Sequence, residues 1–255
     1  MTAASALPRY SSPDTSTLGR KMTNAEIQAR FNAEVAEAYS QRKPVWLPEY
    51  NYALNLVTKV LEPCLASKPS VRVLDLGAGT GNLARRILRR FKNSHVTLAD
   101  FSQNMLDEVP NVLSAFPGRY ETQCVDFWQA DFPAASFDAV VSSFALHHGR
   151  GEAVYRALYQ KIHRWLKPAG IFACCDVVEG DTPVLAALNE SGWRQYLSRR
   201  LTPENVERMF SSYRREDSPI ALRRHLSLLE QAGFPSADVL WKRFNFAVYV
   251  GVKEN

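Results

Sequence analysis

The sequence predicts an α/β fold in which helices cover both faces of a mostly parallel sheet, and three observations support this. Short β-rich runs alternate with helical patterns through the middle of the chain. A glycine loop follows the first β-rich run and opens a helix. The chain ends with two β-rich runs, 237–243 and 246–253, whose connection is too short for a crossover, so they must pair antiparallel.

The N-terminal part is predicted to hold a tail and two helices. Residues 1–21 are rich in Ser, Thr and Pro, which is typical of a disordered tail, and an organelle transit peptide is the alternative. Apolar residues recur at helical spacing from Asn24 to Tyr39 and from Tyr50 to Leu61, and Pro44 separates the two runs. We expect one domain over residues 22–255 that begins with a helical cover over residues 22–65.

The alternation of strands and helices begins at residues 71–76 and ends with a buried strand at 171–178. Between them the sequence predicts strands at 95–99, 120–125 and 137–142, helices after the glycine loop and over 103–116 and 152–166, and a turn at 167–170. Such an alternation is typical of a parallel sheet. Residues 181–230 have helical spacing without a strand signal, and we expect a helical lid there.

Composition excludes several classes of protein. The net charge of +5 permits an anionic partner, but no basic extension or RNA module is visible, so nucleic-acid binding is not expected. The four cysteines have no C-x-x-C spacing and no histidine at ligand distance, so we expect reduced core residues and no metal. No apolar stretch is long enough to span a bilayer and the N-terminus lacks a secretory apolar run, which predicts a cytoplasmic protein without membrane contact.

The glycine loop, Asp75-Leu-Gly-Ala-Gly-Thr-Gly81, predicts a ligand site. A dinucleotide fingerprint needs its third glycine one residue later, where this chain has Asn82, so NAD and FAD are disfavoured. The carboxylate of Asp75 suits an ammonium group and repels a pyrophosphate. Asp100 ends the next predicted strand, 21 residues past Gly79, which is close to the offset at which an acid meets a ribose diol. The implied ligand is a nucleoside without a pyrophosphate.

Three segments in this order, Asp75–Gly81, Leu98–Met105 and Val125–Phe127, resemble successive motifs of the class I S-adenosylmethionine (SAM)-dependent methyltransferases. The resemblance spans about residues 25–255 and implies a Rossmann-like seven-stranded sheet with SAM as cofactor. In this family pattern the counterpart of Asp100 binds the ribose, and that of Asp126 accepts the adenine amino group. The cofactor-binding residues expected from the resemblance are Tyr50, Asp75, Gly77, Gly79, Asp100, Phe101, Met105, Asp126, Phe127 and Ser143.

The methyl acceptor is expected beyond the fourth strand, where two histidines, His147 and His148, follow the carboxyl end of a sheet strand. Methyl transfer is an in-line displacement, so the protein must hold an acceptor lone pair opposite the sulfur and take a proton from a protonated acceptor. One of the two histidines is therefore the candidate catalytic base, and a structural role is the alternative. Tyr39, Trp193 and Arg199 are candidate substrate-binding residues, although the arginine-rich lid also fits a solvated face with ion pairs.

A second resemblance keeps another function open. Pro48-Glu-Tyr50 and the closing segment from Gly233 to Phe246 are similar to the carboxy-SAM synthases, in which an arginine of the insertion holds the extra carboxylate. Arg199 or Arg200 falls in that region. The loop is Gly-Ala-Gly-Thr-Gly rather than Gly-Cys-Ser, and Ser143 stands where the synthases carry Asn.

These departures favour an O- or N-methyltransferase of a small molecule. A carboxy-SAM synthase-like or tRNA-modification-related enzyme is the alternative, and a non-catalytic SAM-binding regulator is the second alternative. Nothing in the sequence decides between a monomer and a homodimer.

Overall fold

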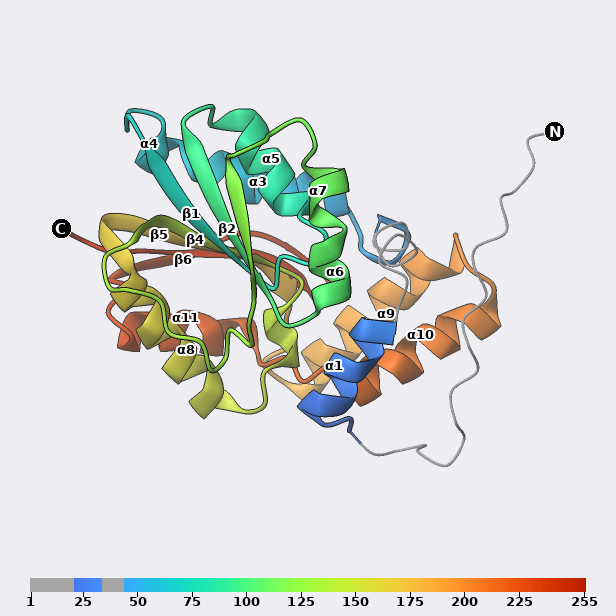
Figure 1. The fold of residues 1–255 in the computed structure, drawn as a ribbon. Coiled ribbons are helices and arrows are strands. Elements are labelled where there is room, and N and C mark those ends of the chain that lie inside the picture. Colours follow the sequence, from blue (N-terminus) through green and yellow to red (C-terminus); the bar gives the residue numbers. More distant parts are fainter. Residues whose placement is uncertain (1–20, 34–43) are drawn as a thin grey trace.

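The computed structural model describes residues 21–33 and 44–255, and these residues build a seven-stranded sheet between two layers of helices (Figure 1). The strand order is β3-β2-β1-β4-β5-β7-β6. The first five strands run parallel to one another, whereas β7 lies antiparallel to both β5 and β6. The predicted fold class is confirmed. The strands are β1 (Val71–Leu76), β2 (Ser94–Asp100), β3 (Tyr120–Cys124), β4 (Phe137–Ser143), β5 (Leu166–Val177), β6 (Ser236–Arg243) and β7 (Phe246–Val252).

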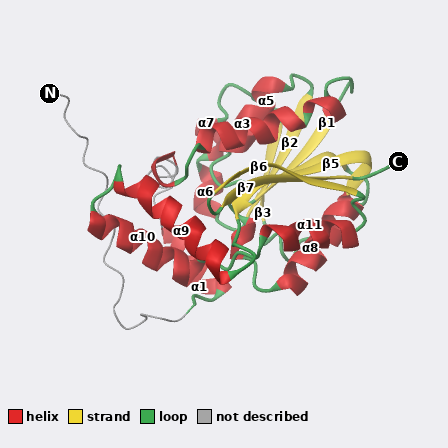
Figure 2. Cartoon of the chain, turned by 180° about the vertical axis from the view of Figure 1, so that it is seen from behind, coloured by secondary structure: helices red, strands yellow, loops and turns green. Residues whose placement is uncertain are grey.

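Helices on the two faces of the sheet bury separate apolar clusters. One face is covered by α3 (Tyr50–Val60), α4 (Glu62–Leu65) and α5 (Asn82–Arg90), and the opposite face by α8 (Glu152–Trp165) and α11 (Leu222–Gln231) (Figure 2). Because the central strands are buried on both sides, every residue of β4 is buried and apolar runs replace the usual alternation. None of the described helices is long and apolar enough to cross a membrane.

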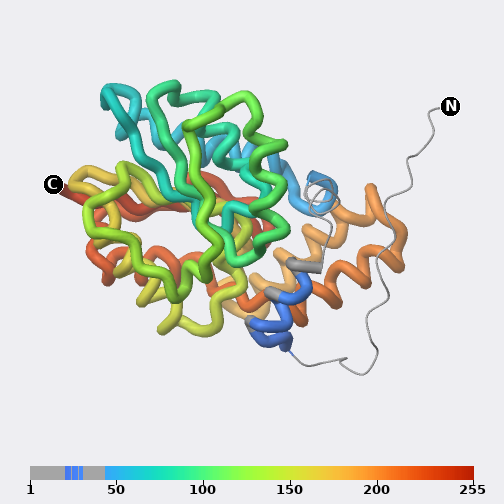
Figure 3. Tube along the Cα trace, viewed as in Figure 1, coloured from blue at the N-terminus to red at the C-terminus, as the bar shows by residue number. Residues whose placement is uncertain are grey.

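Two short helices, α6 (Gln103–Asp107) and α7 (Val109–Val112), bury Leu106 and Val109 in the same apolar cluster as α3 and α5. The remaining helices, α1 (Asn24–Ala33), α9 (Pro183–Ser198) and α10 (Pro203–Glu216), gather at one end of the sheet (Figure 1). Figure 3 shows the blue N-terminal segment beside the orange segment of α9 and α10, far apart in sequence. The backbone N–H of Met22 donates to the carbonyl of Arg215 at 2.9 Å, which ties these two segments together.

The structure corrects two predicted elements. The helix predicted over 103–116 is divided into α6 and α7 because Pro110, in the first turn of α7, has no N–H to donate to a preceding carbonyl. The turn predicted at 167–170 lies inside β5, where the pairing with β4 shifts register and Ala169 adopts a positive φ of 56°. Those residues therefore form a bulge in the strand rather than a turn before it.

The structure agrees with the predictions for the N-terminal cover, the lid and the cysteines only in part. Residues 34–43 lie outside the described residues, so the second half of the predicted first helix, with Tyr39, is not seen. Within the predicted lid, α9 and α10 pack on each other, whereas α11 packs on α8 and on the closing strands. Cys174 and Cys175 are buried and form no disulfide, as expected, but Cys124 is exposed because it ends the edge strand β3.

Candidate active site

The glycine loop turns directly off the end of β1 toward its neighbouring strand. The backbone N–H groups of Gly77 and Ala78 both donate to the carbonyl of Ala99, at 2.8 and 3.2 Å. Gly77 has a φ of 65°, and a Cβ placed on it would lie 2.2 Å from the Cβ of Ala145. Gly79 has a φ of 55° and open space where its Cβ would be. The loop therefore needs glycine at both positions, at the first for close packing and at the second next to a cavity.

Asp100 sits at the end of β2 with its carboxylate fixed by the backbone. Its Oδ2 accepts a hydrogen bond of 2.8 Å from the N–H of Gly79, and its Oδ1 accepts one of 2.9 Å from the N–H of Ser102. The residue is 7% exposed, and it borders a cavity. We name this the cofactor cavity, which is lined by Gly77, Gly79, Asp100, Phe101, Met105, Phe127, Trp128, Phe144, Ala145 and His148.

The lining fits the nucleoside of SAM. A buried carboxylate suits two ribose hydroxyl groups, and the aromatic and thioether side chains form an apolar slot for a purine ring. Six of the ten expected cofactor-binding residues line the cavity, which are Gly77, Gly79, Asp100, Phe101, Met105 and Phe127.

The other four expected cofactor-binding residues lie elsewhere. The carboxylate of Asp126 accepts hydrogen bonds from Trp128 N and Gln129 Nε2, both at 3.0 Å, so it caps the turn that follows it. Tyr50 lies behind the cavity wall, with its ring 5.6 Å from that of Phe144, and burial raises the pKa of its hydroxyl to about 12. Asp75 and Ser143 are buried at the ends of β1 and β4 and are absent from the cavity lining.

A second cavity lies between the end of β4 and the helices α1, α9 and α10. It shares Phe144 and His148 with the cofactor cavity, so the two spaces meet at these side chains. Phe144 has a positive φ of 55°, a strained backbone state that concentrates at functional sites. We name this space the acceptor cavity, which is lined by Arg30, Trp46, Leu47, Phe144, His147, His148, Val177, Trp193, Met209, Ser212, Tyr213, Glu216 and Asp217.

Both predicted histidines line the acceptor cavity, on a short 3₁₀ turn (Leu146–His148) after β4. The carboxylate of Asp176, on β5, holds this turn. Its Oδ2 accepts from the backbone N–H groups of Leu146 and His147 at 2.6 and 3.2 Å, and its Oδ1 lies 2.5 Å from Nδ1 of His147. The Oδ1 atom also accepts from the N–H of Val177 at 2.7 Å. Since Asp176 acts as an acceptor throughout, Nδ1 of His147 donates and Nε2 is left facing the cavity.

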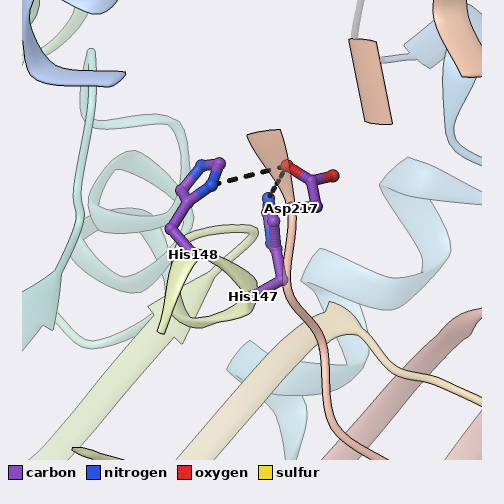
Figure 4. A group of neighbouring side chains, drawn as sticks. All are labelled: His147, His148 and Asp217. Carbon is purple, nitrogen blue, oxygen red and sulfur yellow. Dashed lines mark ion pairs between the residues drawn. The ribbon is translucent and has the colours of Figure 1, made fainter. Parts of the chain in front are cut away.

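Asp217 approaches the two histidines from the end of α10 (Figure 4). Its Oδ1 lies 3.6 Å from Nε2 of His147 and 3.4 Å from Nδ1 of His148. The segment is placed by the N–H of Ser218, which donates to the carbonyl of His147 at 2.8 Å. Burial raises the pKa of Asp217 to about 6, and the nearby His147 opposes that shift. The fold thus gathers two imidazoles and a carboxylate on one wall.

The predicted substrate-binding residues divide. Trp193 is buried in the wall of the acceptor cavity, and its Nε1–H donates to the carbonyl of Trp46 at 2.9 Å. Arg199 is exposed at the end of α9 and lines neither cavity. The cavity's own arginine is Arg30, which is paired with Glu216. Tyr39 lies outside the described residues.

Sequence reasoning missed Asp176, Asp217, Trp128 and Phe144. Two of them could have been found from the sequence, because Asp176 is a charged residue in an otherwise apolar run and Trp128 directly follows an expected cofactor-binding residue. No sequence pattern indicates Asp217, because its position beside the histidines depends on how α10 packs.

Comparison with known proteins identifies a matching domain and related chains. A family model described as a methyltransferase domain matches residues 73–170. A carboxy-S-adenosyl-L-methionine synthase from Nautilia profundicola is 23% identical over 229 residues, which cover 89% of this chain and 96% of that protein.

Two solved structures share the fold. An O-methyltransferase family protein from Burkholderia thailandensis aligns with a TM-score of 0.65 and 16% identity, over 89% of this chain and 62% of that one. The Haemonchus contortus phosphoethanolamine N-methyltransferase 2 in complex with SAM aligns with a TM-score of 0.58 and 18% identity, over 79% of this chain and 53% of that one. Residues 73–170 thus match a methyltransferase domain, and with its strand order and glycine loop the chain shares the fold of these methyltransferases.

Proposed function

We propose that this chain transfers a methyl group from SAM to an oxygen or nitrogen atom of a small molecule. The observation that carries the proposal is the junction of the two cavities at Phe144 and His148. A cofactor in one cavity and an acceptor in the other would face each other across these side chains, as an in-line displacement requires.

On the cofactor side, SAM supplies a methyl group on a sulfonium when it is bound. Asp100 would hold the ribose through the carboxylate oxygens that the backbone of Gly79 and Ser102 already orients. Phe101, Met105 and Phe127 would pack on the adenine. Because the donors that fix Asp100 belong to the backbone, the ribose site is preorganised before the cofactor enters.

On the acceptor side, His147 and His148 would take the acceptor's proton. Asp176 fixes the ring of His147, which lines the cavity, and an imidazole whose Nδ1 donates to a carboxylate can accept a proton at Nε2 near neutral pH. His148 alone of the two also borders the cofactor cavity, so it would lie next to the transferred methyl group. Trp193 and Trp46 would exclude water from the acceptor.

Carboxy-SAM synthesis is the second candidate, and the match to a named synthase over 89% of this chain favours it. In this structure Arg199 is exposed, and the guanidinium of Arg200 lies over the ring of Tyr196 at 3.9 Å. Neither arginine borders the cavities, so a carboxylate on the methyl group would need another cation, of which Arg30 lines the acceptor cavity.

The ligand that copurifies with the protein tests both candidates. We expect mass spectrometry of the denatured protein to find SAM or S-adenosylhomocysteine in stoichiometric amount. Carboxy-SAM in its place would overturn methyl transfer in favour of the second candidate. Variant Asp100→Ala, purified in parallel, is the control that assigns the ligand to the cofactor cavity, because it should carry neither molecule.

A further inference from the structure

The spacing of His147, His148 and Asp217 matches the inner shell of a metal ion. One nitrogen or oxygen atom from each residue lies within 4.8 Å of the others. The oxygen of Asp217 is 3.6 Å from Nε2 of His147 and 3.4 Å from Nδ1 of His148. Both separations exceed the usual N–H···O distance of about 2.9 Å. Two ligands of a tetrahedral ion with bonds of about 2.1 Å are about 3.4 Å apart, which agrees with these separations.

The surroundings of His147 agree with this role. A histidine that binds a metal usually donates its other ring N–H to a carboxylate, which fixes the ring and the tautomer. Asp176 makes that contact at 2.5 Å, and its two oxygens also accept three backbone N–H bonds. Nε2, on the other side of the ring, lies 3.6 Å from Oδ1 of Asp217, so a cation between the two atoms could be bound by both.

We propose that Nε2 of His147, Nδ1 of His148 and Oδ1 of Asp217 bind one divalent transition-metal ion in the wall of the acceptor cavity. Two imidazoles and one carboxylate suit Zn²⁺, Fe²⁺ or Co²⁺, whereas Mg²⁺ and Ca²⁺ prefer oxygen ligands alone. The three residues leave open coordination positions, and all of them line the cavity where the acceptor would sit. These three ligands could not be predicted from the sequence, because Asp217 is far along the chain from the two histidines.

The proposed metal ion indicates which class of acceptor would bind, and this inference rests on the proposed methyltransferase function. A bound ion would take the hydroxyl or enol oxygen of an acceptor that carries a second oxygen donor beside it, and would lower the pKa of that hydroxyl. The proton leaves to solvent, and the oxygen lone pair forms the new C–O bond. The C–S bond breaks and its electron pair stays on sulfur, so the products are a methyl ether and S-adenosylhomocysteine. With the ion bound, the two histidines act as ligands rather than as bases.

Metal binding is tested on the full-length chain without any acceptor. After treatment with a chelator, we expect calorimetric titration with Zn²⁺ to give one site per chain, and Co²⁺ to give the visible absorption of a four- or five-coordinate site. Asp217→Asn and His148→Ala should each weaken Zn²⁺ binding by at least about tenfold, and Asp176→Asn by about 10- to 100-fold through the loss of ring orientation. His95→Ala, which alters a partly exposed histidine on β2, is the matched control and should bind like the unaltered chain.

Two results would overturn the metal site. One is the absence of a stoichiometric Zn²⁺ site in the unaltered chain, and the other is equal Zn²⁺ affinity in Asp217→Asn, His148→Ala and the unaltered chain. Circular dichroism of each variant shows that it is folded. Asp217→Asn keeps the shape of the side chain, so it provides the test if His148→Ala does not fold. Because no turnover is measured, failure of the metal site leaves the methyltransferase proposal standing.

Discussion

Asp176 and His147 form the central pair of the acceptor wall, with Oδ1 of the carboxylate 2.5 Å from Nδ1 of the imidazole. Strand β5 contributes the carboxylate and the turn after β4 contributes the ring, so two neighbouring strands of the parallel sheet meet at this contact. Asp176 is 1% exposed and lies behind the histidine rather than in the cavity lining. It is therefore a positioning residue that acts through His147.

Replacing Asp176 with Asn tests this positioning role. The amide keeps the shape of the side chain but can present N–H to Nδ1 of His147, which would turn the ring or reverse its tautomer. We expect kcat to fall by at least about tenfold while the KM for SAM stays within about twofold. Steady-state kinetics with an acceptor that the unaltered chain methylates measures both constants. A parallel rise in the KM for SAM would place Asp176 in the support of the cofactor cavity instead.

Replacing Asp100 with Ala removes the carboxylate that the ribose is proposed to use. Hydrogen bonds to a charged group contribute about 1.5–3 kcal/mol each, so we expect SAM affinity to fall by at least about tenfold in calorimetry. Asp107→Ala is the control, because that carboxylate is exposed on α6 and contacts Gln103 instead of the cavity. Equal SAM affinity in Asp100→Ala and the unaltered chain would move the cofactor out of this cavity.

Replacing Gly77 with Ala tests the packing of the glycine loop. The added Cβ would lie 2.2 Å from the Cβ of Ala145 at a residue with a φ of 65°. Steric overlap and backbone strain together should lower the free energy of unfolding by about 2–4 kcal/mol. Gly118→Ala has nearly the same φ, 72°, but open space around the new Cβ, so it should lose only about 1 kcal/mol. Urea unfolding compares the two, and equal losses would show that contact with Ala145 has no effect.

The buried side chain of His225 should make the free energy of unfolding depend on pH. It is buried among Tyr159 and Tyr249, its Nδ1 lies 2.7 Å from the hydroxyl of Tyr159, and burial lowers its pKa to about 4. The unfolded chain takes up a proton at this residue below about pH 6.5, whereas the folded chain does so only near pH 4. Its contribution to stability is therefore complete above pH 6.5 and is lost as the pH falls to 4, by about 3 kcal/mol.

The variant His225→Gln isolates this effect, because the amide can bond to the tyrosine hydroxyl without titrating. Unfolding free energies at pH 7 and pH 4.5 should differ less in this variant than in the unaltered chain. His95→Gln, on a partly exposed position, should keep the full difference. An unchanged difference in His225→Gln would show that another group causes the acid sensitivity.

The sequence predicted the fold because hydrophobic periodicity and glycine loops are local signals. The cofactor cavity followed from the same motifs, since Gly79, Asp100 and Phe127 each stand at the end of a parallel strand or within three residues after it. Local signals fail where the partner is distant. The carboxylate of Asp176 lies 29 residues past His147, and no pattern links the two.

Arg199 shows why the lid was harder to predict than the loop. The lid's helical spacing was visible, but the face that α9 turns inward is set by its packing on α10. Trp193 is that inward residue, and Arg199 comes six positions later, about 240° around the helix. Because Trp193 faces the acceptor cavity, Arg199 lies on a different side of the helix and does not line the cavity.

Transfer of a labelled methyl group tests the central claim most directly. The chain is incubated with SAM carrying an isotopic label on the methyl group and with an extract of small metabolites, and the products are separated by mass. We expect labelled methyl in a small-molecule product from the unaltered chain, with at least about a hundredfold less from His148→Ala and little from Asp100→Ala. Tight SAM binding without any labelled product would contradict methyl transfer and would favour a SAM-binding regulator.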